Sequence, residues 1–223
     1  MWCLGYGAVL KADCEQYYSS RNALFEISWI KKIMLLTYAE IETALLRHFA
    51  HVVDDDEILD LHDLLLIPHL LTPSAAIAEF EQAMAVTLPQ AFVQFLSHYQ
   101  VDDFAIANVQ FGHGEDYLHH VFQMNQAGIV HPWWQGDKRP VNRVLIAIAE
   151  AHAIILDVVS GEVFAVDSED DVAVLLARGF EDFFRAVASV HLNTVSVPAV
   201  LASLQVSEHG FWQQLPRLQA ASA

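Results

Sequence analysis

Histidines and carboxylates are the residues of this chain whose types could do chemistry. The chain has twelve histidines, and three of them, His113, His119 and His120, lie close to Glu115 and Asp116. Imidazole and carboxylate groups are the usual ligands of zinc and related metals. However, adjacent His119 and His120 would point to different faces of a helix, and the sequence has no HExxH motif. We therefore expect no metal site, and we keep a metal-dependent hydrolase only as the weakest alternative.

Motifs for nucleophilic or phosphate chemistry are also missing. There is no G-x-S-x-G, and Gly112-His113-Gly114 is too short for a phosphate-binding loop. Cys3 and Cys14 form no CxxC and are too few for a disulfide framework, which favours a reduced, cytoplasmic setting. The pair Asp102-Asp103 could act in acid–base catalysis, but a turn explains it more simply. The sequence thus predicts a protein that is not an enzyme and needs no cofactor.

Charge is the strongest clue to partners. The chain has 28 acids and 11 bases, a formal net charge of −17, and no Lys or Arg from His48 to Gly136. Twelve acids lie in that stretch: Asp54, Asp55, Asp56, Glu57, Asp60, Asp63, Glu79, Glu81, Asp102, Asp103, Glu115 and Asp116. Such a chain should repel nucleic acid and anionic membranes, because proteins bind both through Lys and Arg. A solvated acidic surface would account for the charge, but the long base-free stretch favours a cationic protein partner.

Two adjacent tryptophans add an apolar element to this surface. Trp133-Trp134 lies in a segment, residues 127–142, that we expect to be a loop. Tryptophan is frequent both in interface hot spots and in cores, and the two roles are equally open here. We expect the partner-binding residues to come from these acids and tryptophans: Asp102, Asp103, Glu115, Asp116, Trp133 and Trp134.

The elements that must position these residues follow from apolar periodicity. Apolar residues at helical spacing predict one helix over 41–49 and a second one capped by Asp54–Asp56. Further helices are expected from Thr72-Pro73, from Leu88-Pro89, over 117–124 and around 180–187. Alternation predicts a strand over 104–111. The clearest sheet signal follows, with strands over 143–149, 152–158 and 162–166 and a turn at Ser160-Gly161. Helices first, then a meander, then a helix indicate an α+β fold: an antiparallel sheet of about four to six strands flanked by helices.

Several ordered blocks of residues resemble the SUKH superfamily. The first block carries a helix with a Glu, a Leu-Pro and an aromatic helix ending near a Tyr: Ile77–Glu81, Val86–Pro89 and Phe92–Tyr99. The second is similar to that family's hairpin: Ile146-Ala147, Ile154–Asp157 and Ser160–Phe164. The third, Gly179–Phe184, stands where the family has a Ser-Phe-x-x-Phe-Leu helix. Departures occur at three places: Gln100-Val101 replaces a common Asn-Gly, Ala151–Ala153 replaces a Gly-Asp, and Gly179 replaces a Ser.

The resemblance covers about residues 72–190 and implies a binding role. Bacterial members of the superfamily are largely immunity proteins that neutralise toxins, many of them nucleases, and a fungal relative regulates cell-wall glucan synthesis. It therefore implies an immunity protein, and the acidity of the chain favours a basic toxin, with nucleases as one class. A regulatory or scaffold protein is the alternative. We divide the chain into an N-terminal helical extension (1–71), a SUKH-like domain (72–192) and a C-terminal helical tail (193–223), and the oligomeric state stays open.

The remaining composition fits this description. Hydrophobic residues make up 54% of the chain, enough for a real core. Apolar runs such as Leu64–Leu71 are too short to span a bilayer, and the apolar start has no basic residue before it, so we expect a soluble protein without a secretion signal. Because residues 1–36 look irregular, a true start at Met34 is an open alternative.

Overall fold

The computed structural model describes residues 34–53, 63–114, 116–126, 140–150, 152–167 and 172–218. The chain divides into two compact units, Met1–Met34 and Leu35–Ala223, and every element below belongs to the second unit. The predicted helix at Asp54–Asp56 and the loop segment with the two tryptophans lie outside the described residues.

A six-stranded antiparallel sheet forms the centre of the described chain, and its strands neighbour one another in sequence order. The strands are β3 (Ala105–Ile106), β4 (Val109–Gln110), β5 (Arg143–Ala149), β6 (His152–Asp157), β7 (Val163–Asp167) and β8 (Ala173–Ala177). A separate two-stranded sheet pairs β1 (Ile67–Pro68) with β2 (Tyr99–Gln100). All residues of β6 are buried, and successive side chains point to opposite faces, so both faces of this strand are covered. The α+β class with an antiparallel sheet is confirmed.

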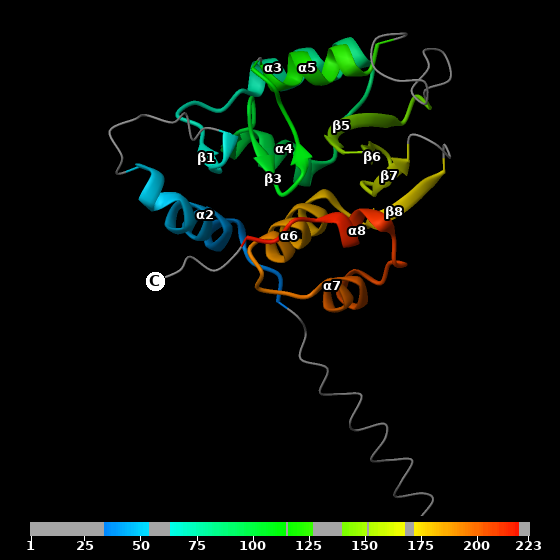
Figure 1. Ribbon diagram of the computed structural model, residues 1–223. Helices are drawn as coiled ribbons and strands as arrows, with labels where there is room; N and C mark the ends of the chain where they lie inside the picture. Colours follow the sequence, from blue (N-terminus) through cyan, green and yellow to red (C-terminus); the bar gives the residue numbers. More distant parts are fainter. Residues whose placement is uncertain are drawn as a thin grey trace, which may run out of the picture. The chain divides into compact units, whose positions relative to one another are not determined.

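Helices pack against the six-stranded sheet. They are α2 (Tyr38–Val53), α3 (Ser74–Met84), α4 (Gln90–His98), α5 (Tyr117–Met124), α6 (Phe180–His191), α7 (Val197–Leu204) and α8 (Gly210–Gln214). Figure 1 shows α3 and α5 side by side at one end of this unit, with α6, α7 and α8 at the other. Five phenylalanines from these helices are buried in one cluster: Phe80, Phe92, Phe95, Phe180 and Phe183.

The hairpin between β6 and β7 forms as its residues predict. Gly161 has a φ of 78°, a conformation that glycine adopts without steric cost. The Asp157 carboxylate accepts the backbone N–H groups of Val159 and Ser160, each at 3.0 Å. Asp157 is therefore a structural acid that holds the turn.

The single strand predicted over 104–111 is wrong. The segment forms the short hairpin β3–β4, in which Ile106 pairs with Val109 and Ala107 has a φ of 58°. The buried positions change phase at this turn, from Phe104 and Ile106 to Val109 and Phe111. That phase change was present in the sequence, but Ala107-Asn108 lacks the glycine that usually marks such a turn.

Two further local predictions need correction. Thr72 does not cap α3, because the helix begins at Ser74 and Pro73 occupies the N-cap without a side-chain hydrogen bond. Strand β8 was not predicted at all. It is a mostly half-buried edge strand that pairs only with β7, so it lacks the clean alternation that marks a strand.

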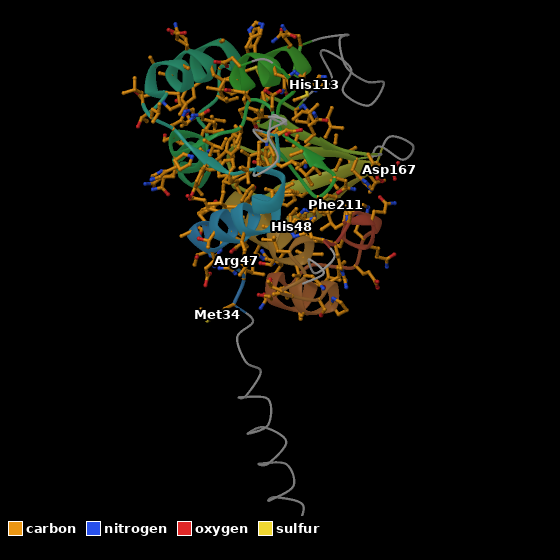
Figure 2. The ribbon with its side chains drawn as sticks, turned by 60° about the vertical axis from the view of Figure 1, so that its left-hand side comes forward. Met34, Arg47, His48, His113, Asp167 and Phe211 are labelled. Carbon is orange, nitrogen blue, oxygen red and sulfur yellow. The ribbon has the colours of Figure 1, made fainter. Side chains whose placement is uncertain are left out.

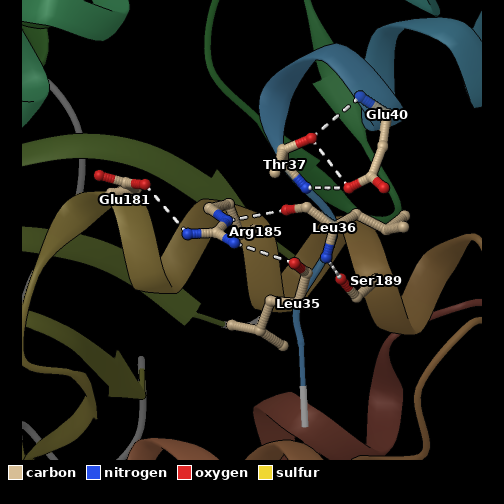
Figure 3. Close-up of polar contacts among 7 residues, drawn as sticks. All are labelled: Leu35, Leu36, Thr37, Glu40, Glu181, Arg185 and Ser189. Carbon is tan, nitrogen blue, oxygen red and sulfur yellow. Dashed lines mark hydrogen bonds and ion pairs between the residues drawn. The ribbon is translucent and has the colours of Figure 1, made fainter. Parts of the chain in front are cut away.

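The segments that flank the central domain pack into the same core. Figure 3 shows how α2 is held: the guanidinium of Arg185 donates to the carbonyls of Leu35 and Leu36, and Ser189 accepts the N–H of Leu36. We call these four residues the α2–α6 clamp. At the C-terminal end, Phe211 and Trp212 of α8 are fully buried. The domain boundaries stay a prediction.

Candidate partner-binding surface

Three of the predicted binding residues meet where two loops touch. Asp102, Asp103 and Asp116 are all exposed. Asp102 and Asp103 lie between β2 and β3, and Asp116 lies at the start of α5. Glu115, Trp133 and Trp134 lie outside the described residues, so their predicted roles are untested.

Backbone N–H groups fix the positions of the first two carboxylates. Asp102 Oδ1 accepts the N–H of Tyr117 at 2.9 Å, and Asp103 Oδ1 accepts the N–H of Gly114. The two loops approach so closely that a Cβ at Gly112 would lie 1.8 Å from the carbonyl oxygen of Asp102. Only glycine fits at this crossing.

Asp116 has a different structural task. It is the N-cap of α5, and its Oδ1 accepts the N–H of His119 at 3.0 Å. A carboxylate at this position also suits the positive end of the helix dipole. We call Asp102, Asp103 and Asp116 together the acidic junction. A carboxylate offers about four lone-pair positions, so one backbone hydrogen bond does not exhaust it.

Helix α5 behind the acidic junction is anchored at both ends. The buried hydroxyl of Tyr117 donates to the carbonyl of Ile146 at 2.9 Å, and burial raises the pKa of this phenol well above its usual value. At the other end, the side chain of Asn125 donates to the Leu145 carbonyl and accepts its N–H, each at 2.9 Å. These bonds tie α5 to β5, so the acidic junction sits on a rigid support.

A groove runs between α3 and α5 beside the acidic junction. Its volume is about 420 Å³, and its walls are residues of the two helices: Ala76, Glu79, Phe80, Ala83, Asp116, Leu118, His119 and Phe122. We call it the α3–α5 groove. A smaller pocket of about 80 Å³ adjoins it through Ala76, Asp116 and Leu118.

The described histidines on this side of the molecule contact glutamine side chains. His119 Nε2 lies 2.7 Å from the side-chain nitrogen of Gln123, and His113 Nδ1 lies 3.3 Å from that of Gln110. Figure 2 shows His113 at the end of the unit that carries α3 and α5. Among the residues that the structure describes, no three His, Cys, Asp or Glu side chains are placed to hold a metal ion. None of the helices in the described ranges combines the length and apolar character needed to cross a bilayer.

Glu81, another acid of the base-free stretch, also bonds to the backbone. Glu81 Oε1 accepts the N–H of Leu88 at 2.7 Å, which closes the turn between α3 and α4. This bond gives a physical reason for the Glu and the Leu-Pro that the sequence carries seven residues apart. By contrast, Glu79 is exposed on the groove wall, and the sequence analysis did not single it out. Its place beside Ala76, Phe80 and Ala83 on one helical face was the signal that could have found it.

Comparison with known proteins identifies the central part of the chain. Residues 72–186, just over half of the chain, match the sequence model of the SMI1/KNR4 family (SUKH-1). The match spans α3 to α6 and so includes the acidic junction and the α3–α5 groove. A comparison with curated proteins gave no significant match.

Proposed function

This chain belongs to the SMI1/KNR4 family (SUKH-1), and on that basis we propose that it is a non-enzymatic binding protein that neutralises a basic protein toxin. The observation that carries the proposal is the acidic junction. It places three exposed carboxylates on a rigid support, within a stretch of 89 residues, His48 to Gly136, that has no Lys or Arg.

Electrostatics gives the proposal its physical basis. An exposed negative face attracts a cationic partner over distances of about a Debye length, about 8–10 Å at ordinary salt. Such steering raises association rates about 10- to 1,000-fold. Toxins that cut nucleic acid need Lys and Arg to hold phosphates, so they offer the matching charge. Immunity function also agrees with the role that the superfamily resemblance implies.

A regulatory or scaffold protein is the second candidate. The superfamily resemblance includes a fungal regulator of cell-wall glucan synthesis, and the same acidic face could recruit a basic partner other than a toxin. A toxin gene beside the gene for this chain favours the immunity role, and its absence favours the regulatory role.

The first test is capture of partners from the source organism by the full-length chain, at low and at moderate salt, with mass spectrometry. We expect a basic toxin in a one-to-one complex that weakens as salt rises. Recovery of cell-wall or signalling proteins alone would reject the toxin assignment in favour of the regulatory role.

The second test asks whether the acidic junction makes the contact. The triple substitution Asp102→Asn, Asp103→Asn and Asp116→Asn removes three charges but keeps an oxygen to accept each backbone N–H. We expect association with the purified partner to slow about tenfold, with a smaller salt dependence. The matched control removes three charges from other elements: Glu42→Gln, Glu162→Gln and Glu208→Gln. Equal slowing in both triple variants would mean that net charge matters and the acidic junction does not.

A further inference from the structure

The α3–α5 groove has the form of a helix-binding site. On α3, the lining residues Ala76, Glu79, Phe80 and Ala83 are spaced by three, four and seven, so they share one helical face. On α5, Leu118 and Phe122 line the groove in the same manner, one turn apart. Two helices lying side by side present parallel ridges and a channel between them, and a third helix packs into such a channel.

The floor of the groove is apolar. Three apolar side chains line it: Phe80 and Leu118, which are 5% and 8% exposed, and Phe122, which is half-buried. Ala76 and Ala83 are small, which lets the axis of a docked helix come close to α3. The volume of about 420 Å³ lies within the range of about 300–1,000 Å³ that is typical of binding pockets.

The rim of the groove carries negative charge. The exposed carboxylates of Glu79 on α3 and Asp116 on α5 border it, and Asp102 lines the pocket that adjoins it. No Lys or Arg occurs anywhere in α3, α4 or α5. A cationic occupant therefore meets carboxylates and no Lys or Arg of these helices, whereas an acidic occupant would be repelled.

From these features we propose that the α3–α5 groove binds a cationic amphipathic helix of a partner protein. Apolar side chains at i, i+3 or i+4, and i+7 of that helix pack on Phe80, Leu118 and Phe122, and its flanking Lys or Arg residues pair with Glu79 and Asp116. A helix satisfies its own backbone hydrogen bonds, so it needs only the apolar floor and the carboxylate rim. This inference rests on the proposed function, because it names how a basic protein partner is held.

The test uses the full chain and a 16-residue helical peptide of Leu and Lys with all Leu residues on one face. Two further peptides serve as probes: a scrambled Leu/Lys peptide and an amphipathic Leu/Glu peptide. Affinity is measured by fluorescence anisotropy, and amide NMR shifts report which residues respond. We expect saturable binding of the amphipathic Leu/Lys peptide alone, with the largest shifts at Phe80, Ala83, Leu118 and Phe122.

Matched variants separate the shape of the groove from net charge. Ala83→Trp fills the groove, whereas Ala78→Trp adds the same side chain at an exposed position of α3 that does not line it. Neither change alters charge or removes a buried group. We expect Ala83→Trp to weaken peptide binding at least about tenfold, a change of about 1.4 kcal/mol, and Ala78→Trp to leave it within about twofold.

Four results would overturn the inference. The first is no saturable binding of the amphipathic Leu/Lys peptide, and the second is equal binding of the scrambled peptide or equal loss in the two Trp variants. The third is a change in the amide NMR signals of the groove residues when Trp133→Ser or Trp134→Ser is measured without peptide. That change would mean that the chain's own segment 127–139 fills the groove. The fourth is retained toxin binding by Ala83→Trp, which would reject the groove but not the proposed function. Capture of partners by the unsubstituted full-length chain tests the proposed function independently.

Discussion

The acidic junction and the α2–α6 clamp use charged side chains in opposite ways. In the clamp, the guanidinium of Arg185 donates to two backbone carbonyls at 2.8 and 2.9 Å and to Glu181 at 3.0 Å, and its side chain is 22% exposed. In the acidic junction, each carboxylate is exposed and accepts a backbone N–H through one oxygen. Arg185 therefore works within the chain, whereas the junction carboxylates keep lone pairs directed to solvent.

The comparison separates structural charge from charge that can meet a partner. Five donor positions in a fixed fork make Arg suited to joining two segments that are far apart in sequence, here separated by about 150 residues. The junction carboxylates are joined to nearby backbone, so their bonds fix where the charge lies without removing it. Each substitution below tests one side of this difference.

The largest effect is expected at the loop crossing of the acidic junction. Gly112→Ala places a Cβ 1.8 Å from the carbonyl oxygen of Asp102 and 2.5 Å from that of Val101, and backbone atoms cannot move aside cheaply. We expect a loss of about 3 kcal/mol or more in the free energy of unfolding, measured by urea denaturation. Gly179→Ala is the control, because nothing lies within 4 Å of its Cβ, and it should change stability by less than about 1 kcal/mol. Similar losses in both variants would contradict the close crossing.

The next largest loss of stability is expected at the α2–α6 clamp. Arg185→Met keeps much of the apolar stem but leaves the carbonyls of Leu35 and Leu36 without their guanidinium donors, so we expect a loss of about 2–3 kcal/mol by the same measurement. Arg185→Lys should restore only part of it, since one ammonium cannot reproduce the fork. Arg178→Met, at an exposed position, should stay within about 0.5 kcal/mol. Full recovery by Arg185→Lys would show that charge alone, and not the fork, holds α2.

Two acids on α3 offer a sharper form of the comparison within one helix. Glu81→Ala removes the acceptor of the Leu88 N–H and should cost about 1 kcal/mol of stability, whereas Glu79→Ala should leave stability nearly unchanged. Binding of a cationic partner should respond in the reverse order, with Glu79→Ala the weaker binder. Denaturation curves and partner affinities of the two variants check this. If one variant lost more in both assays, structural and partner-binding acids could not be told apart on α3.

Regular local patterns explain what the sequence could predict. The bounds of Arg143–Ala149 and Tyr117–Met124 were predicted as observed, because the first is an almost unbroken apolar run and the second has apolar residues at helical spacing. The capping box at α2 was readable as well: Thr37 and Glu40 bond reciprocally, a Thr-x-x-Glu pattern that the sequence analysis passed over. Glycine-free turns, such as that at Ala107, left no such signal.

The candidate site depended on contacts that no local pattern encodes. Asp102, Asp103 and Asp116 were predicted from charge, but their meeting requires the crossing at Gly112. The α3–α5 groove requires two helices more than 30 residues apart in sequence to lie side by side, and the alanines at 76 and 83 look unremarkable until they do. Long-range packing decides these placements, and the periodicity of the sequence does not reveal it.

The smallest effect concerns a third kind of chargeable group, one that the fold keeps neutral. His209 is the N-cap of α8, and its Nδ1 accepts the N–H of Phe211 at 3.2 Å. Burial lowers the pKa of His209, and His152 on β6, whose ring centroid lies 5.2 Å away, lowers it further, while Asp167 on β7 acts in the opposite direction. A protonated Nδ1 could not accept the Phe211 N–H, so protonation would also remove this cap.

The sign of the pH effect follows from that lowered pKa. Below the ordinary histidine pKa, the unfolded chain binds a proton at His209 more readily than the folded chain does. The contribution of His209 to the free energy of unfolding is therefore complete above about pH 6.5, and it declines as the pH falls towards the folded pKa. His209→Asn keeps an acceptor at the N-cap but cannot titrate. We therefore expect the melting temperature of the unsubstituted chain to fall more steeply than that of His209→Asn between pH 7.5 and about pH 5. Parallel curves would mean that His209 titrates equally in both states, and that the fold does not hold it neutral.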